Sequence, residues 1–153
     1  DGSASNDAAH MVNEARQAML LARLRKSLQA PQMQDGRTVF GCDTAPLEMT
    51  ARQALRLATR GGAQVLGRAH DIGQITVGHV ADLAMFDLNT LPLAGGAVHD
   101  AVGSLLRCAS SPTRHTMVHG RLVVRDGQLT TVDLGPLIER HNRLAQTLAQ
   151  AHR

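Results

Sequence analysis

The chain has 153 residues, of which 43% are hydrophobic and 19% are charged, and it carries a formal net charge of +3. Its length and its mean hydropathy of −0.13 predict one globular domain or two small ones. Its apolar runs fall short of the roughly 18 residues that cross a membrane. The arginines are scattered and the only aromatic residues are two phenylalanines, so the base-stacking platforms of single-strand nucleic-acid binders are lacking. We therefore expect neither nucleic-acid binding nor membrane insertion.

The two cysteines, Cys42 and Cys108, are far apart, and neither belongs to a C-x-x-C pair. This spacing predicts reduced thiols in a cytoplasmic protein and excludes a zinc site built from cysteine. Neither cysteine has a neighbouring histidine that would mark an activated thiol.

Residues 1–7 hold a carboxylate at each end and small or polar residues between them. One interpretation is a helix cap, because the side-chain oxygens of Ser5, Asn6 and Asp7 can accept the free N–H groups of a first helical turn. The other interpretation places Asp1 at the end of a strand, aimed into a cleft, with the next residue, a glycine, letting the chain turn away. The local pattern by itself favours the cap.

A long helix is predicted first. Apolar residues spaced by threes and fours favour a helix over about residues 7–28, which is stopped before Pro31. Residues 32–46 show little periodicity, so they are expected to form a loop with a turn at Asp35-Gly36.

A second helix is predicted after residue 50. Thr50 and Gln53 have the spacing of a capping box, and the helix that they begin is expected to end at Gly61-Gly62. A short helix over residues 63–66 should follow and stop at Gly67.

The second half of the chain has a different pattern, in which short apolar runs alternate with glycines. Residues 72–87 and 115–130 are expected to be short strands of one small sheet system, with Asp126-Gly127 as a hairpin turn. The apolar segment 100–108 between them could be a helix or a strand, and a helix is favoured. A last helix begins near Pro136. The apolar stripe of this last helix consists of Leu137, His141, Leu144 and Leu148.

Three segments resemble the amidohydrolase superfamily. Residues 72–87 resemble the segment by which these enzymes pass from their barrel into a small β-sandwich domain, and residues 118–127 resemble later strands of that domain. Residues 1–7, followed by Glu14-Ala-Arg16, resemble the end of barrel strand eight and the helix after it. The sequence of this strand end and helix is similar to that of the deaminases that act on purines, pterins and triazines. Residues 16–23 look closest to the 8-oxoguanine deaminases and the related hydroxytriazine hydrolases.

The resemblance implies an α/β fold, namely the C-terminal part of a (β/α)8 TIM barrel plus strands of a small β-sandwich. Residues 1–70 would hold the last strand, its loop and helices of the barrel, residues 71–133 part of the β-sandwich domain, and residues 134–153 a C-terminal helix. The paired histidines, the two further histidines and the acidic residue of the family have no counterpart here. A barrel of this kind takes about 250 residues. The expected partner is therefore the N-terminal remainder of the same enzyme, and a homo-oligomer is compatible with this interpretation.

By the same resemblance, the reaction is metal-dependent hydrolytic deamination of an aromatic amidine ring, with Asp1 as both metal ligand and catalytic proton acceptor. A bound divalent metal lowers the pKa of water to about 7, and a catalytic zinc site keeps one position open for that water. Zn²⁺ is expected, although one carboxylate is also compatible with Fe²⁺ or Mn²⁺. The substrate would be a small heterocycle, either 8-oxoguanine or a related purine, or a triazine. The chain also differs from the family pattern at His79, where the family often carries a lysine.

Other polar residues are weaker candidates. His10 could line the mouth of the site, although a surface position is favoured, and Ser3 could touch substrate or satisfy loop backbone. The histidines of the β-rich part are too separated to predict a metal cluster; they are His99, His115 and His119. Two other interpretations stay open: a non-catalytic fragment that completes another chain's barrel, and an autonomous β-rich binding module. Expressed alone, the chain is expected to have neither tight metal binding nor deaminase activity.

Overall fold

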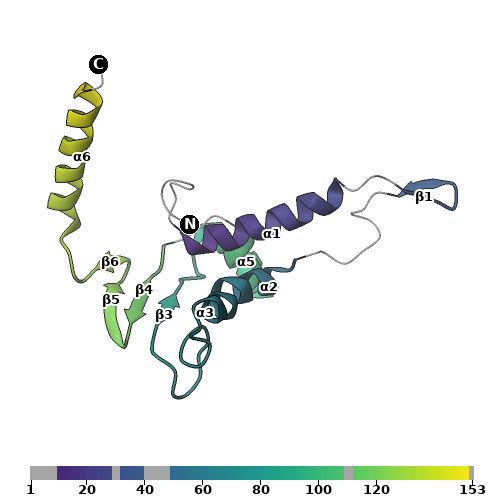
Figure 1. Ribbon diagram of the computed structural model, residues 1–153, viewed down its shortest axis with the longest axis horizontal. Coiled ribbons are helices and arrows are strands. Elements are labelled where there is room, and N and C mark those ends of the chain that lie inside the picture. The colour runs from purple at the N-terminus through teal and green to yellow at the C-terminus, as the bar shows by residue number, and fades with distance from the viewer. Residues whose placement is uncertain (1–9, 29–31, 40–48, 109–111, 152–153) are drawn as a thin grey trace. The chain divides into compact units, whose positions relative to one another are not determined.

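The computed structural model describes residues 10–28, 32–39, 49–108 and 112–151 (Figure 1). It contains both helices and strands and divides into two compact units. The first unit comprises Asp1–His79 and Asp87–Ser111, and the second comprises Val80–Phe86 and Pro112–Arg153. The three ranges expected from the sequence, residues 1–70, 71–133 and 134–153, stay predictions.

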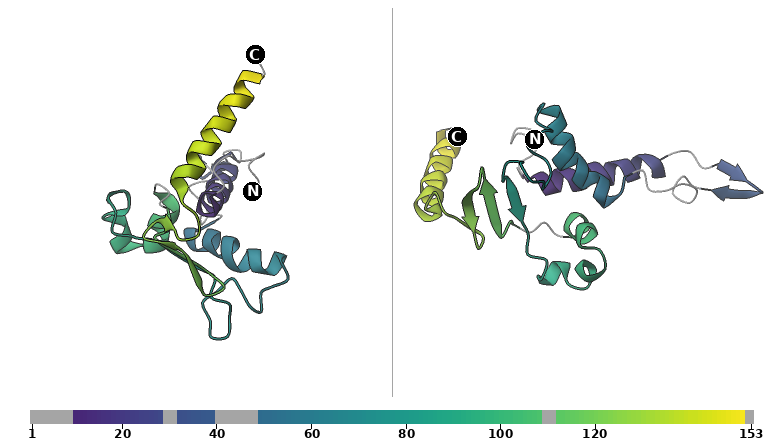
Figure 2. Two further views of the ribbon diagram at one scale, coloured as in Figure 1. Left: turned by 90° about the vertical axis from the view of Figure 1, so that its left-hand side faces the viewer. Right: turned by 90° about the horizontal axis from the view of Figure 1, so that it is seen from below.

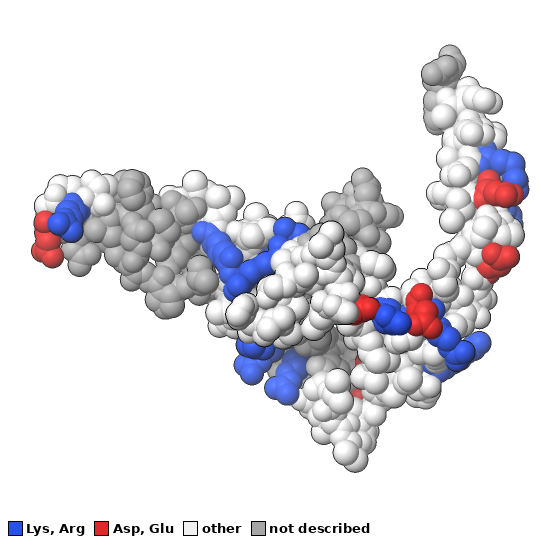
Figure 3. Space-filling view, turned by 180° about the vertical axis from the view of Figure 1, so that it is seen from behind, with Lys and Arg blue, Asp and Glu red and all other residues white. Residues whose placement is uncertain are grey.

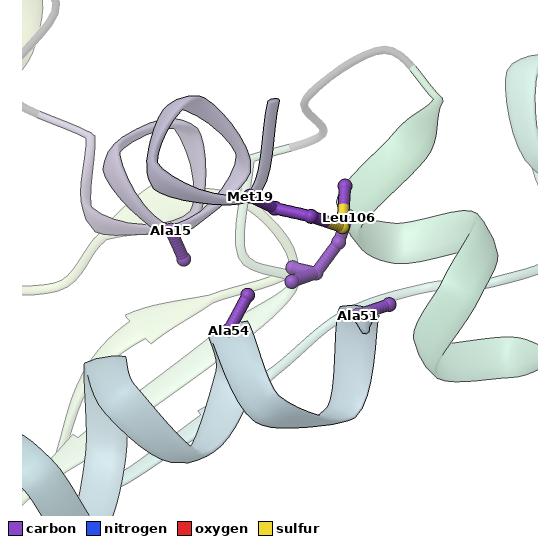
Figure 4. Packing of buried hydrophobic residues seen from close by; sticks show 5 residues of the cluster. All are labelled: Ala15, Met19, Ala51, Ala54 and Leu106. Carbon is purple, nitrogen blue, oxygen red and sulfur yellow. The ribbon is translucent and has the colours of Figure 1, made fainter. Parts of the chain in front are cut away.

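Three helices of the first unit share a small core. They are α1 (Met11–Ser27), α2 (Ala51–Arg56) and α5 (Ala101–Arg107). Most of the buried residues at this place are alanines, which lets the helices approach closely (Figure 4). The core consists of Ala15, Met19, Ala51, Ala54 and Leu106. Within the described residues, the structure confirms the expected first helix and the expected helix within residues 100–108.

The second helix continues past the point where the sequence predicts its end. After α2 come a π-helical turn, η1 (Leu57–Gly61), and α3 (Gly62–Val65), without a break in the helical path. The predicted end at Gly61-Gly62 is wrong, because both glycines keep ordinary right-handed helical backbone angles. Gly67 has a φ of +69°, which glycine adopts readily, and ends the helical segment as expected.

Thr50 caps α2. Its hydroxyl accepts a hydrogen bond from the Gln53 N–H at 3.2 Å, while Gln53 Oε1 accepts one from the Thr50 N–H at 2.8 Å. The expected capping box is therefore confirmed.

We expect Thr50→Ala to lower the free energy of unfolding by about 1 kcal/mol, because the first-turn N–H groups lose their acceptor. Chemical denaturation measures this loss. Thr59→Ala is the matched control, since the Thr59 hydroxyl donates to carbonyls of the preceding helical turn, those of Leu55 and Arg56. Such bonds add little to helix stability. Equal losses in the two variants would argue against the cap.

A β-hairpin follows α1 where the sequence analysis expects a loop. Strands β1 (Gln32–Gln34) and β2 (Arg37–Val39) pair antiparallel across the turn at Asp35-Gly36. Both turn residues have positive φ, +50° and +74°, as in the type I′ turn that suits the twist of two paired strands. The turn is confirmed and the loop is wrong over these residues, whereas residues 40–46 lie outside the described residues.

The second unit contains a four-stranded antiparallel sheet in the order β3-β4-β5-β6 (Figure 2). Its strands are β3 (Leu83–Met85), β4 (His115–Val118), β5 (Arg121–Arg125) and β6 (Gln128–Leu129). Two-residue turns at His119-Gly120 and Asp126-Gly127 join the last three strands, again with positive φ at both positions. One sheet thus unites the two expected strand segments, and the second sheet of a sandwich stays a prediction.

Residues 72–82 are not strands, so that part of the sequence prediction is wrong. They form turns and bends, with Gly73 and Gly78 at φ of +90° and +89°. The end of this segment is tied to the β4–β5 turn, because Asp82 Oδ1 accepts from the His119 N–H at 2.6 Å and the Ala81 carbonyl accepts from Gly120 N–H at 3.1 Å. Its apolar residues therefore follow a turn-rich path rather than a strand.

Short helices and one long helix complete the described chain. Between β3 and β4 lie η2 (Leu91–Leu93), α4 (Gly96–His99) and α5, whose first turn is capped by Asp100 Oδ1 accepting from Gly103 N–H at 3.0 Å. The last element is α6 (Leu134–Ala151), which confirms the expected C-terminal helix. Asp133 Oδ1 accepts from the Gly135 N–H at 3.1 Å at its start. No helix in the described ranges is long and apolar enough to cross a membrane.

Candidate functional site

The residue on which the sequence analysis places the chemistry, Asp1, lies outside the described residues, as does Ser3. Its roles as metal ligand and proton acceptor therefore stay predictions. The described chain begins at His10, directly before α1, so the start of this helix is the part of the structure that follows the expected site loop in sequence.

His10 lies at the start of α1 and is half-buried rather than exposed. Its carbonyl accepts from the N–H groups of Asn13 at 2.9 Å and Glu14 at 3.1 Å, which opens the helix. The imidazole Nδ1 atom is buried and has no hydrogen-bond partner among the described residues. A buried ring nitrogen ordinarily has a partner, so His10, which lies close in sequence to residues 1–7, has unused hydrogen-bonding capacity.

The start of α1 is held in place by packing and by one long-range hydrogen bond. Ala15 and Met19 contact the core shared with α2 and α5. Between them, Arg16 donates from Nη1 to the Cys108 carbonyl at the end of α5, at 3.0 Å. The start of α1 is therefore anchored to the end of α5 as well as to the shared core.

The remaining histidines that the structure describes are not brought together. His99 ends α4 and is exposed, His119 occupies the β4–β5 turn, and His141 is exposed on α6. His115 accepts the Asp126 N–H through Nδ1 at 3.3 Å, and its Nε2 lies 3.8 Å from Asp126 Oδ1. His79, at the position where the family often has lysine, has its Nε2 atom 3.2 Å from Gln74 Nε2. These imidazole rings contact different neighbours and do not form a cluster that could bind a metal.

Asp71 is a charged residue that the sequence analysis does not single out. Arg68 donates to its Oδ2 atom from Nε at 3.2 Å and from Nη2 at 2.5 Å. This guanidinium holds the pKa of the Asp71 carboxyl below its usual value. A carboxylate stabilised in its charged form is a poor proton acceptor, so we assign Asp71 to the loop after α3 and not to the chemistry.

The described residues do not fit a zinc site on their own. A catalytic zinc ion takes at least three protein ligands, and no group of three His, Cys, Asp or Glu side chains lies together in the described part of the chain. Cys108 is a free, half-buried thiol, and Cys42 falls outside the described residues. A metal held by Asp1 would need its other ligands from sequence beyond the described residues.

Charged side chains do not form a continuous basic surface on the face that Figure 3 shows. Lys and Arg residues lie there in separate groups, some of them beside Asp or Glu residues. Nucleic-acid binding would need a basic stripe or patch, so this face gives no support to that function.

Comparison with known proteins places the chain in a family of hydrolytic enzymes. Residues 1–123 match the amidohydrolase family, and the chain belongs to it. It is 42% identical over 148 residues to an 8-oxoguanine deaminase from Pseudomonas aeruginosa, a match that covers 97% of this chain and 28% of the deaminase.

Two solved structures resemble the chain at the level of the fold as well. An adenosine deaminase from Xanthomonas campestris with bound zinc is 26% identical, with a TM-score of 0.77 over 98% of this chain and 30% of that one. The atrazine chlorohydrolase from Arthrobacter aurescens TC1, complexed with zinc, is 29% identical, with a TM-score of 0.74 over 94% of this chain and 28% of that one. The chain thus spans less than a third of the length of these relatives.

Two features of this region are absent from the sequence analysis. The hydrogen bond from Arg16 to Cys108 joins residues 92 positions apart, and no local pattern marks such a pair. The ion pair between Arg68 and Asp71 has a spacing of three residues, which could have been noticed in the sequence.

Proposed function

We propose that this chain is the C-terminal part of a metal-dependent enzyme that hydrolytically deaminates an aromatic nitrogen heterocycle. The observation that carries the proposal is the 42% identity to an 8-oxoguanine deaminase over almost the whole chain. We favour 8-oxoguanine or a related purine as substrate, with a triazine as second candidate because of the likeness to the atrazine chlorohydrolase.

In this proposal Asp1 carries the proton chemistry. Hydrolytic deamination adds water to the ring carbon that bears the amino group, and then releases ammonia. Asp1 accepts a proton from the attacking water and passes it to the departing amine, which a carboxylate at the C-terminal end of a barrel strand is placed to do. A divalent metal, for which the zinc-bound relatives favour zinc, supplies water of lowered pKa.

His10 has a supporting place in the proposal. It follows Asp1 by nine positions in the sequence, and its buried Nδ1 atom lacks a partner among the described residues. A substrate or a side chain from the rest of the enzyme would satisfy it. We infer that His10 lies at the edge of the site rather than at the reacting atoms.

The structure of the second unit argues against an autonomous binding module. None of its described residues is buried, although it contains a four-stranded sheet and an 18-residue helix. Burial of apolar surface is the main favourable contribution to folding. A unit without a core of its own is better explained as part of a larger enzyme, with the N-terminal remainder as partner.

Expressed alone, the 153-residue chain should retain no stoichiometric zinc after dialysis against a chelator and should release no ammonia from purines or triazines. The reason is that the described residues hold no set of three metal ligands. Metal analysis and an ammonia assay on the chain and on the longer enzyme, side by side, test this expectation. Stoichiometric zinc and turnover in the isolated chain would overturn the proposal that it is only a part of the enzyme.

A further inference from the structure

The C-terminal helix α6 has a face that nothing else in the second unit covers. All of its residues from Gly135 to Ala151 are exposed, and it contributes no buried residue. Its large apolar side chains are about half exposed or more: Leu137 at 50%, Leu144 at 55% and Leu148 at 64%. In proteins, most of the stability of a helix comes from the packing of its amphipathic face rather than from helix propensity. The helix therefore needs a partner surface.

The apolar side chains of α6 lie on one side. At about 100° per residue, the residues Leu134, Leu137, Ile138, Leu144, Ala145 and Leu148 span about 120° of the helix circumference. His141 lies within this arc. The opposite side carries Glu139, Asn142, Arg143 and Gln146. One face is thus suited to a protein interior, and the other is suited to water.

The width of the face indicates what covers it. A coiled coil with a second copy of α6 would use a narrow seam sustained over at least about three heptads. The 18 residues of α6 provide fewer than three, and its apolar arc is wider than such a seam. A wide arc is typical of a helix that packs on a globular body.

We propose that this face packs against the part of the longer enzyme that precedes residue 1, in the same polypeptide. The inference rests on the proposed function, in which this chain is the C-terminal portion of that enzyme. The solved relatives that match it have about 70% of their chains outside the match. The sheet of the same unit has no buried residue either, so both the sheet and the helix lack a covering layer of the kind that a large neighbouring domain provides.

Amide hydrogen exchange of α6 tests the proposal. In the 153-residue chain the backbone amides of α6 should exchange rapidly, and in the longer enzyme at least about 100-fold more slowly, because packed helices open only with larger unfolding events. The amides of α1 around Met19, in the core of the first unit, report whether the isolated chain is folded. Slow exchange of the α6 amides in both proteins would show that the surface covering α6 belongs to the 153-residue chain itself, and it would overturn the proposal. Fast exchange in both would show a solvated face and overturn it as well.

A pair of substitutions in the longer enzyme decides the matter even where the isolated chain is unfolded. Leu144→Ala should lower Tm by about 5 °C or more through loss of buried contacts, while Gln146→Ala, on the opposite side, should leave it within about 1 °C. The molar mass from light scattering should be the same for both variants and the parent. A halved mass for Leu144→Ala alone would identify a second copy as the partner, and equal Tm values would show that the face is not covered.

The same samples separate this inference from the proposed function. An enzyme that is inactive on every heterocycle tested but protects α6 would refute the function and leave the packing of α6 standing. An active enzyme whose α6 amides are unprotected would refute the packing of α6 and leave the proposed function standing.

Discussion

Asp1→Asn is expected to lower the kcat of the longer enzyme by about 10²- to 10⁴-fold, the usual cost of losing a positioned general base. Asparagine keeps the size of the side chain and one of its oxygens, but it cannot accept the proton of the attacking water. The expected pattern is a large loss of turnover in a folded protein. Steady-state kinetics at a temperature where the variant stays folded, together with its metal content, measure it.

The helix-cap interpretation of residues 1–7 predicts a different result. Asparagine is as good a cap as aspartate, and even a lost cap costs only about 1 kcal/mol of stability. Asp7→Asn is the matched control, because it makes the same chemical change at the other carboxylate of the segment. Near-normal turnover in Asp1→Asn, or equal loss in both variants, would reduce Asp1 to a loop residue.

Gly73→Ala should be among the most destabilising single substitutions in the first unit. Gly73 has a φ of +90°, and an added Cβ would come to 2.7 Å from Ala63 Cβ and 3.1 Å from the Thr59 carbonyl oxygen, with the backbone of η1 directly behind. The variant thus combines left-handed strain with overpacking, and we expect a loss of about 2–5 kcal/mol. Denaturant midpoints measure the loss.

Gly78→Ala separates the backbone strain from the overpacking. Gly78 has nearly the same φ, +89°, but nothing lies within 4 Å of an added Cβ. Its loss should be limited to the backbone strain, about 1–2 kcal/mol. Equal losses at the two glycines would show that the close approach of the loop to η1 contributes nothing.

Sequence patterns predict the elements that depend on near neighbours. The capping box of Thr50 and Gln53 and the turn at Asp126-Gly127 need only residues within a few positions of each other, and both form as expected. The hairpin at Asp35-Gly36 has the same turn chemistry. Its strands are missed because they are only three residues long and lack an apolar alternation.

The predictions that depend on tertiary packing are less accurate. Gly61 and Gly62 look like a helix end, but the helix continues through η1, against which Gly73 packs closely. Residues 72–82 have the composition of strands, yet glycines with positive φ and the bonds to the β4–β5 turn make them a turn-rich connection. Both segments contact residues outside their own local pattern, namely Gly73 beside η1 and the β4–β5 turn beside residues 81–82.

The candidate site follows from the family resemblance and not from local chemistry. A single carboxylate before a helix is an ordinary cap by its pattern alone, and only the likeness of residues 1–7 to the end of barrel strand eight gives Asp1 a catalytic role. The described residues hold no set of three metal ligands, so neither the metal nor the heterocycle follows from them.

Ammonia release by the longer enzyme, measured on a panel of 8-oxoguanine, guanine, a pyrimidine and a hydroxytriazine, tests the central claim most directly. The proposed function predicts turnover of at least one of these rings, abolished by removal of the metal and restored by zinc. Turnover of none of them by a folded, zinc-loaded enzyme would contradict it.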